Sequence, residues 1–345
     1  MRDNTTVSTL PGTRLPAAAA AIVALFLLSM QPAPAAETSP AAEATPTGLT
    51  VQDGALLRDG QPYRAVGVNF PHLFQALIDN PESSAPIDGL AYLGRKKIPF
   101  VRFWACGFYP ADWDLYFEDR EEWFRRMDRV VRAAEEAGVG LVPSLFWRFS
   151  TYPELMDQYR QAWADPDSKT RQFMRRYVRQ VVTRYSDSPA IWGWEFANEL
   201  NLACDLPNGM KQLGRKIPHL GVNQARDRRN LLTHEIAQKA LRAFGRQVRK
   251  HDPHRFITTG NSHLRPSQWH QATEDSWTRD NPEQTRRAFE WFTPDPVNVT
   301  SIHLYSNKFD GEVRHADARG IGGVLGMFSR MSASMGKPLF LGEFA

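Results

Sequence analysis

The sequence predicts an α/β fold of the (β/α)8 or TIM barrel class, and three observations lead to this prediction. Short apolar runs of strand length alternate with longer stretches of helical periodicity from about residue 49 onwards, which is typical of a parallel sheet flanked by helices. No strand is followed by the glycine-rich turn that marks a dinucleotide-binding doubly wound sheet. With 345 residues, of which 42% are hydrophobic, the chain is long enough for one barrel domain.

Residues 1–36 have the features of a secretory signal peptide. Arg2 and Arg14 supply positive charge, residues 16–30 form a short apolar core, and small residues at 33–36 offer a cleavage site. A single membrane anchor is the alternative, although the apolar core is short for a span. Residues 37–48, rich in Ala, Pro, Thr and Glu, predict a flexible linker. We therefore expect a secreted or periplasmic protein that is free of the membrane once the signal is cleaved.

The barrel domain is expected to span residues 49–345. Its first residues, 49–63, contain the turn signals Asp53-Gly54 and Asp59-Gly60, which predict a small hairpin that closes the floor of the barrel. Apolar runs then predict strands, in order, at residues 64–70, 98–104, 139–147, 191–197, 254–260, 297–304 and 338–343. Apolar residues at helical spacing predict helices near residues 119–137, 167–185 and 228–250.

Charge and cysteine content exclude some classes of function. The formal net charge is +4, and basic residues are interspersed with acidic ones along the helices, so they predict solvated helix faces rather than a nucleic-acid surface. His234-Glu235 lacks the second histidine of a zinc-protease motif, and we expect neither a metal nor a cofactor. Cys106 and Cys204 leave either a disulfide or two buried free thiols. Free thiols are favoured, because the strands that precede the two cysteines are not neighbours in the predicted order.

Two glutamates stand at the carboxyl ends of predicted strands. Residues 191–199 read Ile-Trp-Gly-Trp-Glu-Phe-Ala-Asn-Glu, a buried-strand pattern that ends in Asn198 and Glu199. Residues 337–344 repeat the arrangement with Glu343 near the far end. One such glutamate alone is equally consistent with a helix cap, but parallel strands carry their chemistry at their carboxyl ends, so two suggest a facing pair. Hydrolysis of a glycosidic bond needs such a pair, and their separation, which the sequence leaves open, decides the stereochemistry.

Polar and aromatic residues mark the other strand ends. Arg102 is predicted to be buried, so it needs an acidic partner, and it is expected to lower the pKa of the nucleophilic carboxylate. His303 and Tyr305 lie two residues apart on one strand and therefore face the same side. Trp104 and Trp147, at the ends of their strands, are candidates for stacking on the apolar faces of sugar rings. Each residue alone is more often structural, but together with two carboxylates they predict a substrate-binding site.

This ordered set of residues resembles glycoside hydrolase family 5. The resemblance covers about residue 49 to the end of the chain and rests on Arg102, Asn198-Glu199, His303-x-Tyr305 and Gly342-Glu343-Phe344. It implies a retaining hydrolysis in which Glu199 is the acid/base and Glu343 is the nucleophile. It also implies that Asn198 binds the sugar 2-hydroxyl and that Arg102 orients the nucleophile. His303 and Tyr305 would position the substrate and the nucleophile.

The chain departs from the family pattern in two places. Phe146-Trp147-Arg148 stands where many members carry a histidine. The sequence also stops at Ala345, two residues after Glu343. We therefore expect the last βα unit of the barrel to be missing from this chain, so that the domain 49–345 is incomplete at its C-terminus.

The segment at residues 194–199 bears on the substrate, because Trp-Glu-Phe-Ala-Asn-Glu resembles the mannanase branch of the family more than the cellulase branch. The leading expectation is a monomeric, retaining, endo-acting hydrolase of β-1,4-mannan, with polysaccharide as its only partner. A β-1,4-glucanase is the first alternative. A non-catalytic carbohydrate-binding barrel is the second, since the expected end of the barrel is missing.

Overall fold

The computed structural model describes residues 47–305 and 314–344. The predicted signal peptide, residues 1–36, and nearly all of the predicted linker, residues 37–48, lie outside the described residues. The chain from Thr45 to Ala345 forms one compact unit. No helix within the described ranges is long and apolar enough to cross a membrane.

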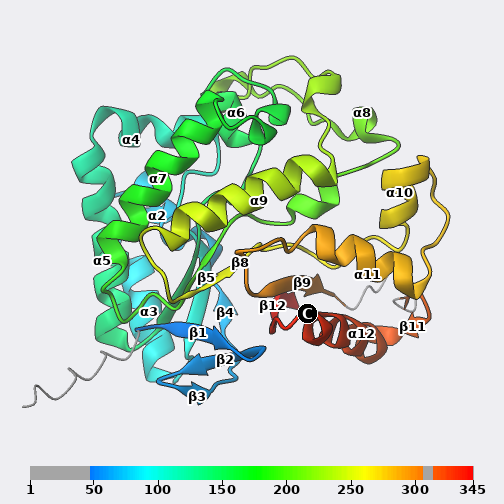
Figure 1. The fold of residues 1–345 in the computed structure, drawn as a ribbon. Helices are drawn as coiled ribbons and strands as arrows, with labels where there is room; N and C mark the ends of the chain where they lie inside the picture. The colour runs from blue at the N-terminus through cyan, green and yellow to red at the C-terminus, as the bar shows by residue number, and fades with distance from the viewer. Residues whose placement is uncertain (1–46, 306–313, 345) are drawn as a thin grey trace, which may run out of the picture. The chain divides into compact units, whose positions relative to one another are not determined.

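Parallel strands form the centre of this unit (Figure 1). A five-stranded sheet runs in chain order through β4 (Val68–Asn69), β5 (Phe100–Trp104), β6 (Gly140–Ser144), β7 (Gly193–Glu195) and β8 (Phe256–Thr258). Strand β12 (Leu339–Phe344) pairs with β9 (Thr300–Leu304), also in parallel. The amide of Val299 donates to the carbonyl of Ile257 over 3.1 Å, which brings the start of β9 beside β8. The predicted fold class and the predicted strand order are confirmed.

The strands are shorter than predicted, and the first one most of all. Of the predicted strand 64–70, only Val68 and Asn69 pair with β5. Residues 64–66 are exposed instead. Strand β7 likewise keeps only the middle of the predicted strand 191–197. An apolar pattern reports burial rather than pairing, so it extends past both ends of the hydrogen-bonded ladder.

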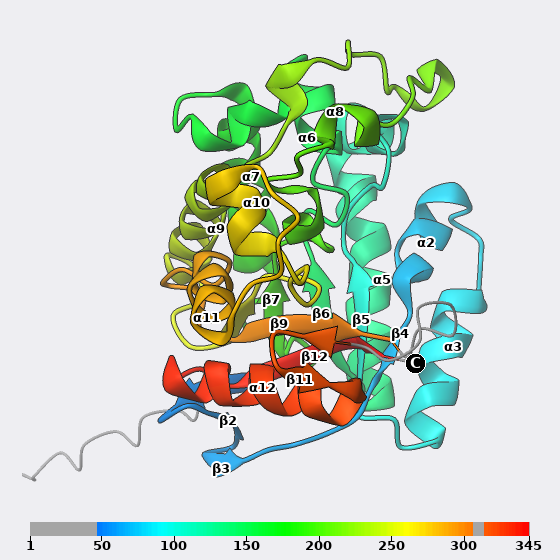
Figure 2. The ribbon, with the colours of Figure 1, turned by 90° about the vertical axis from the view of Figure 1, so that its right-hand side faces the viewer.

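Long helices flank the sheet: α3 (Ala85–Arg95), α5 (Arg120–Ala137), α7 (Lys169–Tyr185), α9 (His234–Arg249), α11 (Pro282–Trp291) and α12 (Gly320–Ser334). The three helices predicted from the sequence are α5, α7 and α9. Helix α9 starts at His234 rather than near residue 228, because Thr233 caps it by accepting a hydrogen bond from the amide of Ile236. Helix α12 lies along β9 and β12 (Figure 2).

Helix α5 shows how the sequence sets these boundaries. Its buried residues, among them Trp123, Met127 and Ala134, recur at helical spacing and form one apolar face. Asp119 caps the start, since its carboxylate accepts from the amide of Glu122 over 2.9 Å. Gly138 ends the helix with φ 66°, a left-handed conformation that costs glycine little.

Shorter elements connect the long ones, mostly at the ends of the strands where the site lies. They are η1 (Pro71–Leu73), α2 (Gln75–Asp79), η2 (Pro110–Trp113), α4 (Asp114–Glu118), α6 (Thr151–Leu155), η3 (Arg160–Ala164), η4 (Leu200–Ala203), α8 (Gly209–Gln212), η5 (Pro218–Leu220), η6 (Arg228–Asn230), α10 (Gln268–Glu274), β10 (Arg314–His315) and β11 (Ala318–Arg319).

An antiparallel sheet closes the floor of the barrel, as predicted. It contains β1 (Leu49–Gln52), β2 (Ala55–Arg58) and β3 (Gln61–Pro62). The amide of Leu49 donates to the carbonyl of Trp192 over 2.9 Å. The side chain of Leu49 is buried in an apolar cluster with Val142, Trp192, Phe256 and Val299. These contacts fix the bottom of the barrel at the end opposite to the functional residues.

Strands β4 and β12 face each other across the side of the barrel where sheet pairing stops. Within residues 47–305 and 314–344, no backbone ladder joins these two strands. The link that the structure does provide is a side-chain hydrogen bond of 3.0 Å from Asn69 Nδ2 to the carbonyl of Gly342. A cavity of about 660 Å³ lies between them, lined mainly by apolar residues of β4, β12 and the floor.

Both cysteines are free thiols, and both Cys106 and Cys204 are fully buried. The preferred prediction of two buried thiols is confirmed, and the disulfide alternative is excluded. Burial raises the pKa of the Cys106 thiol to about 12, although Tyr152 and Trp147 act in the opposite direction. Neither thiol is therefore a reactive nucleophile at neutral pH.

Candidate active site

Glu199 follows β7 in a strained turn that points the chain toward β8. Its φ of 52° lies in the left-handed region, and its amide donates to the carbonyl of Gly260 over 2.8 Å. Gly260 also has a positive φ, of 70°, and a Cβ there would lie 1.8 Å from the carbonyl oxygen of Ala197. Only glycine allows this close approach. The ends of β7 and β8 are thereby locked together beneath the Glu199 side chain.

Glu343 reaches the same region from β12. The register of β12 against β9 shifts between Leu341 and Glu343, and Glu343 is paired with His303. Gly342 makes this irregularity possible, because a Cβ at that position would lie 2.8 Å from Nε2 of His303. Irregular pairing of this kind re-aims side chains next to functional sites.

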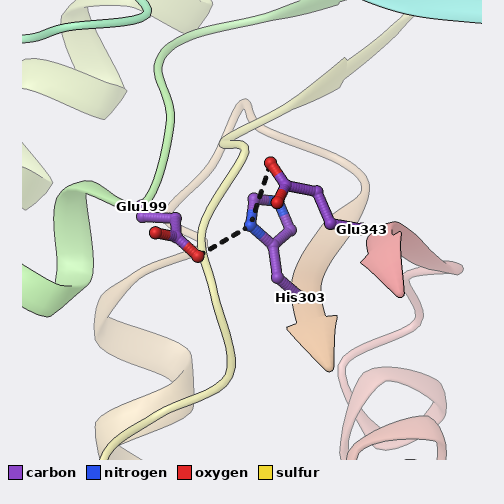
Figure 3. A group of neighbouring side chains, drawn as sticks. All are labelled: Glu199, His303 and Glu343. Carbon is purple, nitrogen blue, oxygen red and sulfur yellow. Dashed lines mark hydrogen bonds and ion pairs between the residues drawn. The ribbon is translucent and has the colours of Figure 1, made fainter. Parts of the chain in front are cut away.

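His303 joins the two glutamates (Figure 3). Its Nδ1 lies 3.0 Å from Oε1 of Glu199 and 3.5 Å from Oε1 of Glu343. One donor atom from each of the three residues lies within 4.8 Å of the other two. His303 is fully buried, whereas the side chains of Glu199 and Glu343 are 32% and 17% exposed. Two carboxylates therefore reach one accessible space over a buried imidazole.

Arg102 lies beneath Glu343 and makes polar contacts with four residues, while only 1% of its side chain is exposed. Nη1 lies 2.7 Å from Oε1 of Glu343, and Nε lies 2.8 Å from Oε2 of Glu195. Nη2 donates to Oδ1 of Asn198 over 2.8 Å, and Nη1 donates to Oδ1 of Asn69 over 3.3 Å. A rigid guanidinium fork suits such simultaneous recognition, which lysine does not reproduce.

Glu195 and Asn69 are the residues of this network that sequence reasoning missed. The sequence indicated that Arg102 needs an acidic partner, and Glu195, with 0% of its side chain exposed, is a partner that it did not identify. A signal was present, since Glu195 is the one charged residue inside the apolar run 191–197. A buried carboxylate in such a run needs a paired cation. Asn69 stands at the end of the predicted strand 64–70, but the sequence assigned it no role.

The environment of Glu343 favours its ionised form. Burial alone would raise the pKa of this carboxyl, but His303, the hydroxyl of Tyr305 and the guanidinium of Arg102 together hold the pKa below its ordinary value. The Tyr305 hydroxyl donates to Oε2 of Glu343 over 2.5 Å. The pKa of Tyr305 is raised, first by burial and then by this hydrogen bond, so the hydroxyl keeps its proton.

The structure places the two candidate stacking residues, Trp104 and Trp147, in packing contacts. They are 5% and 9% exposed, and their ring centroids lie 5.2 Å apart. The ring of Trp147 also lies over the guanidinium of Arg102, at 4.4 Å from Cζ. As placed, Trp147 supports Arg102 by a cation–π contact. A stacking role for either indole gains no support, because little of either ring faces solvent.

The cluster of Glu199, His303 and Glu343 has donor types and spacing that suit a metal ion. Both oxygens of Glu343 are already engaged, one by Arg102 and the other by Tyr305. A guanidinium 2.7 Å from the carboxylate would also repel a divalent cation. The donor set therefore fits a metal poorly, and it fits a pair of catalytic carboxylates well.

A pair of carboxylates that reach one accessible space is what hydrolysis of a glycosidic bond requires. The sequence model of the family Cellulase (glycosyl hydrolase family 5) matches residues 95–345. The chain therefore belongs to glycosyl hydrolase family 5, which confirms the resemblance inferred from the sequence.

Curated relatives include a probable mannan endo-1,4-beta-mannosidase C from Aspergillus terreus, 28% identical over 186 residues, which are 52% of this chain and 39% of the relative. A probable mannan endo-1,4-beta-mannosidase A-1 from the same organism is 40% identical over 82 residues, 22% of this chain and 21% of the relative. The chain thus matches well under half of the length of either relative.

Solved structures with similar folds include the endo-1,4-beta-mannanase of Eisenia fetida, with a TM-score of 0.55 and 16% identity. That match covers 87% of this chain and 81% of the other. The endo-1,4-beta-mannanase of Rhizomucor miehei gives a TM-score of 0.52 and 15% identity, covering 75% of this chain and 72% of the other. At these identities the likeness supports the barrel fold.

Proposed function

We propose that this chain is a retaining, endo-acting glycoside hydrolase that cleaves β-1,4-linked mannan. The observation that carries the proposal is the meeting of Glu199 and Glu343 around His303, with donor atoms of all three residues within 4.8 Å of one another. Retaining enzymes place their two carboxyl groups about 5–5.5 Å apart, whereas inverting enzymes leave room for a water at about 6.5–9.5 Å. The short separation therefore supports retention.

In the first step, Glu343 attacks the anomeric carbon and the glycosidic C–O bond breaks. Glu199 gives its proton to the leaving oxygen, so that the departing sugar leaves as an alcohol. Arg102 and Tyr305 hold Glu343 ionised and aligned, one at each carboxylate oxygen. Asn198, whose Oδ1 is fixed by Arg102, presents its amide to the 2-hydroxyl of the sugar.

In the second step, water attacks the anomeric carbon and releases Glu343. Glu199, now ionised, takes a proton from that water. Each step inverts the anomeric carbon, so the product keeps the β configuration. Both steps use the same accessible space above His303, and neither needs a redox cofactor.

The choice of mannan rests on the curated relatives, which are named as mannan endo-1,4-beta-mannosidases. The alternative substrate is β-1,4-glucan, because the matched family model is named Cellulase. The test compares initial rates of reducing-sugar release from soluble mannan and soluble β-glucan, with proton NMR of the first product. We expect faster release from mannan and a β-anomer first. Faster release from β-glucan would mean that β-1,4-glucan, not mannan, is the preferred substrate. An α-anomer as the first product would overturn the retaining mechanism.

We also propose that the protein is exported through residues 1–36 and acts as a monomer. The basic and apolar segments of these residues support export. Expression with and without residues 1–36, followed by fractionation, tests it. Activity that stays with the cells in both cases would contradict export, and a dimer mass by light scattering would contradict the monomer.

A further inference from the structure

A separate pocket opens beside Glu199, away from Glu343. Its volume is about 360 Å³, within the ~300–1,000 Å³ typical of small-ligand sites. Asn198 and Glu199 form one wall, apolar residues of the loop after β7 form another, and Arg160 lines it from η3. Glu343, His303 and Tyr305 are not among its lining residues. If Glu199 protonates the leaving oxygen, this pocket lies on the leaving-group side of the cleaved bond.

Arg160 is half-buried, and its guanidinium has no hydrogen-bond acceptor among the described residues. Its Nε is buried with no hydrogen-bond partner, and no ion pair of Arg160 is found within residues 47–305 and 314–344. The guanidinium lies 5.7 Å from the ring of Phe149, which supplies a flat support but no acceptor. A half-buried guanidinium without an acceptor keeps its N–H donors free for an anion that enters from solution.

Two further arginines, Arg226 and Arg148, lie close enough to act on Arg160. Burial, followed by Arg226 and Arg148, lowers the pKa of Arg160 to about 10, so it stays charged at neutral pH. Arg226 pairs with Glu154, and Arg148 donates to the hydroxyl of Thr151 over 3.0 Å. Glu154, the carboxylate that opposes this shift, is already engaged by Arg226. Among residues 47–305 and 314–344, Glu199 is the acidic residue that lines the pocket.

We infer that this pocket binds the carboxylate of an acidic sugar on the leaving-group side of the cleaved bond, with Arg160 as the residue that pairs with it. The inference rests on the proposed function, because it takes Glu199 as the acid/base. A planar guanidinium favours bidentate contact with a carboxylate. The carboxylate belongs either to a unit of the main chain or to a substituent on it. The substrate class is thereby extended from neutral β-1,4-mannan to mannan that carries uronic acid groups.

The experiment compares kcat/KM on neutral mannan with kcat/KM on two acidic mannans. One is partially oxidised at C6, which places the carboxylate on the main chain, and the other is carboxymethylated, which makes it pendant. Arg160→Gln should lower the acidic-to-neutral ratio about tenfold for the form that fits, and Arg160→Lys should lower it less. Arg132→Gln, which removes an exposed arginine from α5, is the matched control and should leave the ratio unchanged. In the unmodified enzyme, added salt should reduce the ratio, since it screens the charge.

Binding measurements distinguish the proposed carboxylate pocket at Arg160 from the proposed hydrolase function. Calorimetry with C6-oxidised oligosaccharides on the Glu343→Ala chain, with and without Arg160→Gln, should show weaker binding in the double variant. If the chain binds acidic oligosaccharides through Arg160 but hydrolyses no polysaccharide, the pocket stands and the proposed function falls. If hydrolysis proceeds and Arg160→Gln changes acidic and neutral substrates equally, Arg160 contacts hydroxyls and the inference is overturned. An unchanged ratio in both arms, or equal binding by both calorimetry variants, also overturns it.

Discussion

Arg102 Nη1 lies 2.7 Å from Oε1 of Glu343, although 241 positions separate the two residues in the chain. Arginine does not lose its proton in proteins, so the carboxylate on β12 always faces a fixed positive charge from β5. Because this guanidinium is buried, water screens the pair little. Together with His303 and Tyr305, this guanidinium lowers the pKa of the proposed nucleophile.

Removal of either glutamate should abolish turnover of polysaccharide, but azide should distinguish the two. Glu199→Ala on an activated aryl β-mannoside still forms the covalent intermediate, and azide then replaces the water that needs a base. The product should be the β-mannosyl azide. With Glu343→Ala, azide takes the place of the nucleophile and should give the α-anomer. NMR of the products checks this, and an exchange of the two outcomes would reverse the assigned roles.

Arg102→Lys should reduce kcat/KM by roughly 10–100-fold, the range of a lost charge-assisted hydrogen bond of ~1.5–3 kcal/mol. Weaker support of the ionised form raises the pKa of Glu343, so the acidic limb of the kcat/KM profile should move to higher pH. Tyr305→Phe removes one neutral donor and should move the limb less, in the same direction. A rate loss that is uniform across the pH range would mean that Arg102 acts only on folding.

Stability should depend on the ionisation of Glu343 in acid. Its pKa in the folded chain lies below the ordinary value of 4.5, so the folded state binds fewer protons than the unfolded state does. This contribution to stability is complete above about pH 4.5 and is lost as the pH falls through the folded pKa. The difference in Tm between the unmodified chain and Glu343→Gln should therefore shrink from pH 6 to pH 3. A constant difference over that interval would count against the lowered pKa.

Gly260→Ala should destabilise the fold far more than Gly60→Ala, although the two glycines have φ of 70° and 74°. Both variants force alanine into a left-handed conformation, at about 1–2 kcal/mol. At Gly60 a Cβ meets nothing within 4 Å, whereas at Gly260 it meets the carbonyl oxygen of Ala197 at 1.8 Å. We expect Gly260→Ala to exceed its control by at least ~2 kcal/mol in urea unfolding. Equal losses would show that the β7–β8 junction relaxes easily.

Much of this architecture could be predicted because burial and periodicity are local properties of a sequence. The strand order, helices α5, α7 and α9, and the floor hairpin all followed from patterns within short windows. Strand lengths could not be predicted, because pairing depends on which neighbour lies alongside. The strand at residues 64–70 shrank to Val68–Asn69 for this reason, since it pairs on only one side within the described residues.

The candidate site was predicted where polar residues stand near the ends of apolar runs, and Glu195 was missed because it lies within such a run. Glu199, Glu343, His303 and Tyr305 meet as the strand positions indicated. Glu195 was overlooked because it reads as part of an apolar strand, and its role depends on Arg102, 93 positions away. Trp147 was expected to stack on a sugar ring, because its contact with the Arg102 guanidinium exists only in the folded chain.

The contacts of Arg102 and Asn69 also hold two strands of the barrel together. Arg102 grips Asn69 on β4 and Glu343 on β12, and Asn69 itself reaches the carbonyl of Gly342. These hydrogen bonds connect β4 and β12, whose backbones form no ladder with each other within the described residues. Replacing Arg102 should therefore allow β4 and β12 to separate more often. Amide hydrogen exchange should then become faster in both strands, whereas α5 and α7 should keep their protection. A substitution of Arg102 that is made to change the pKa of Glu343 would therefore also weaken the connection between β4 and β12.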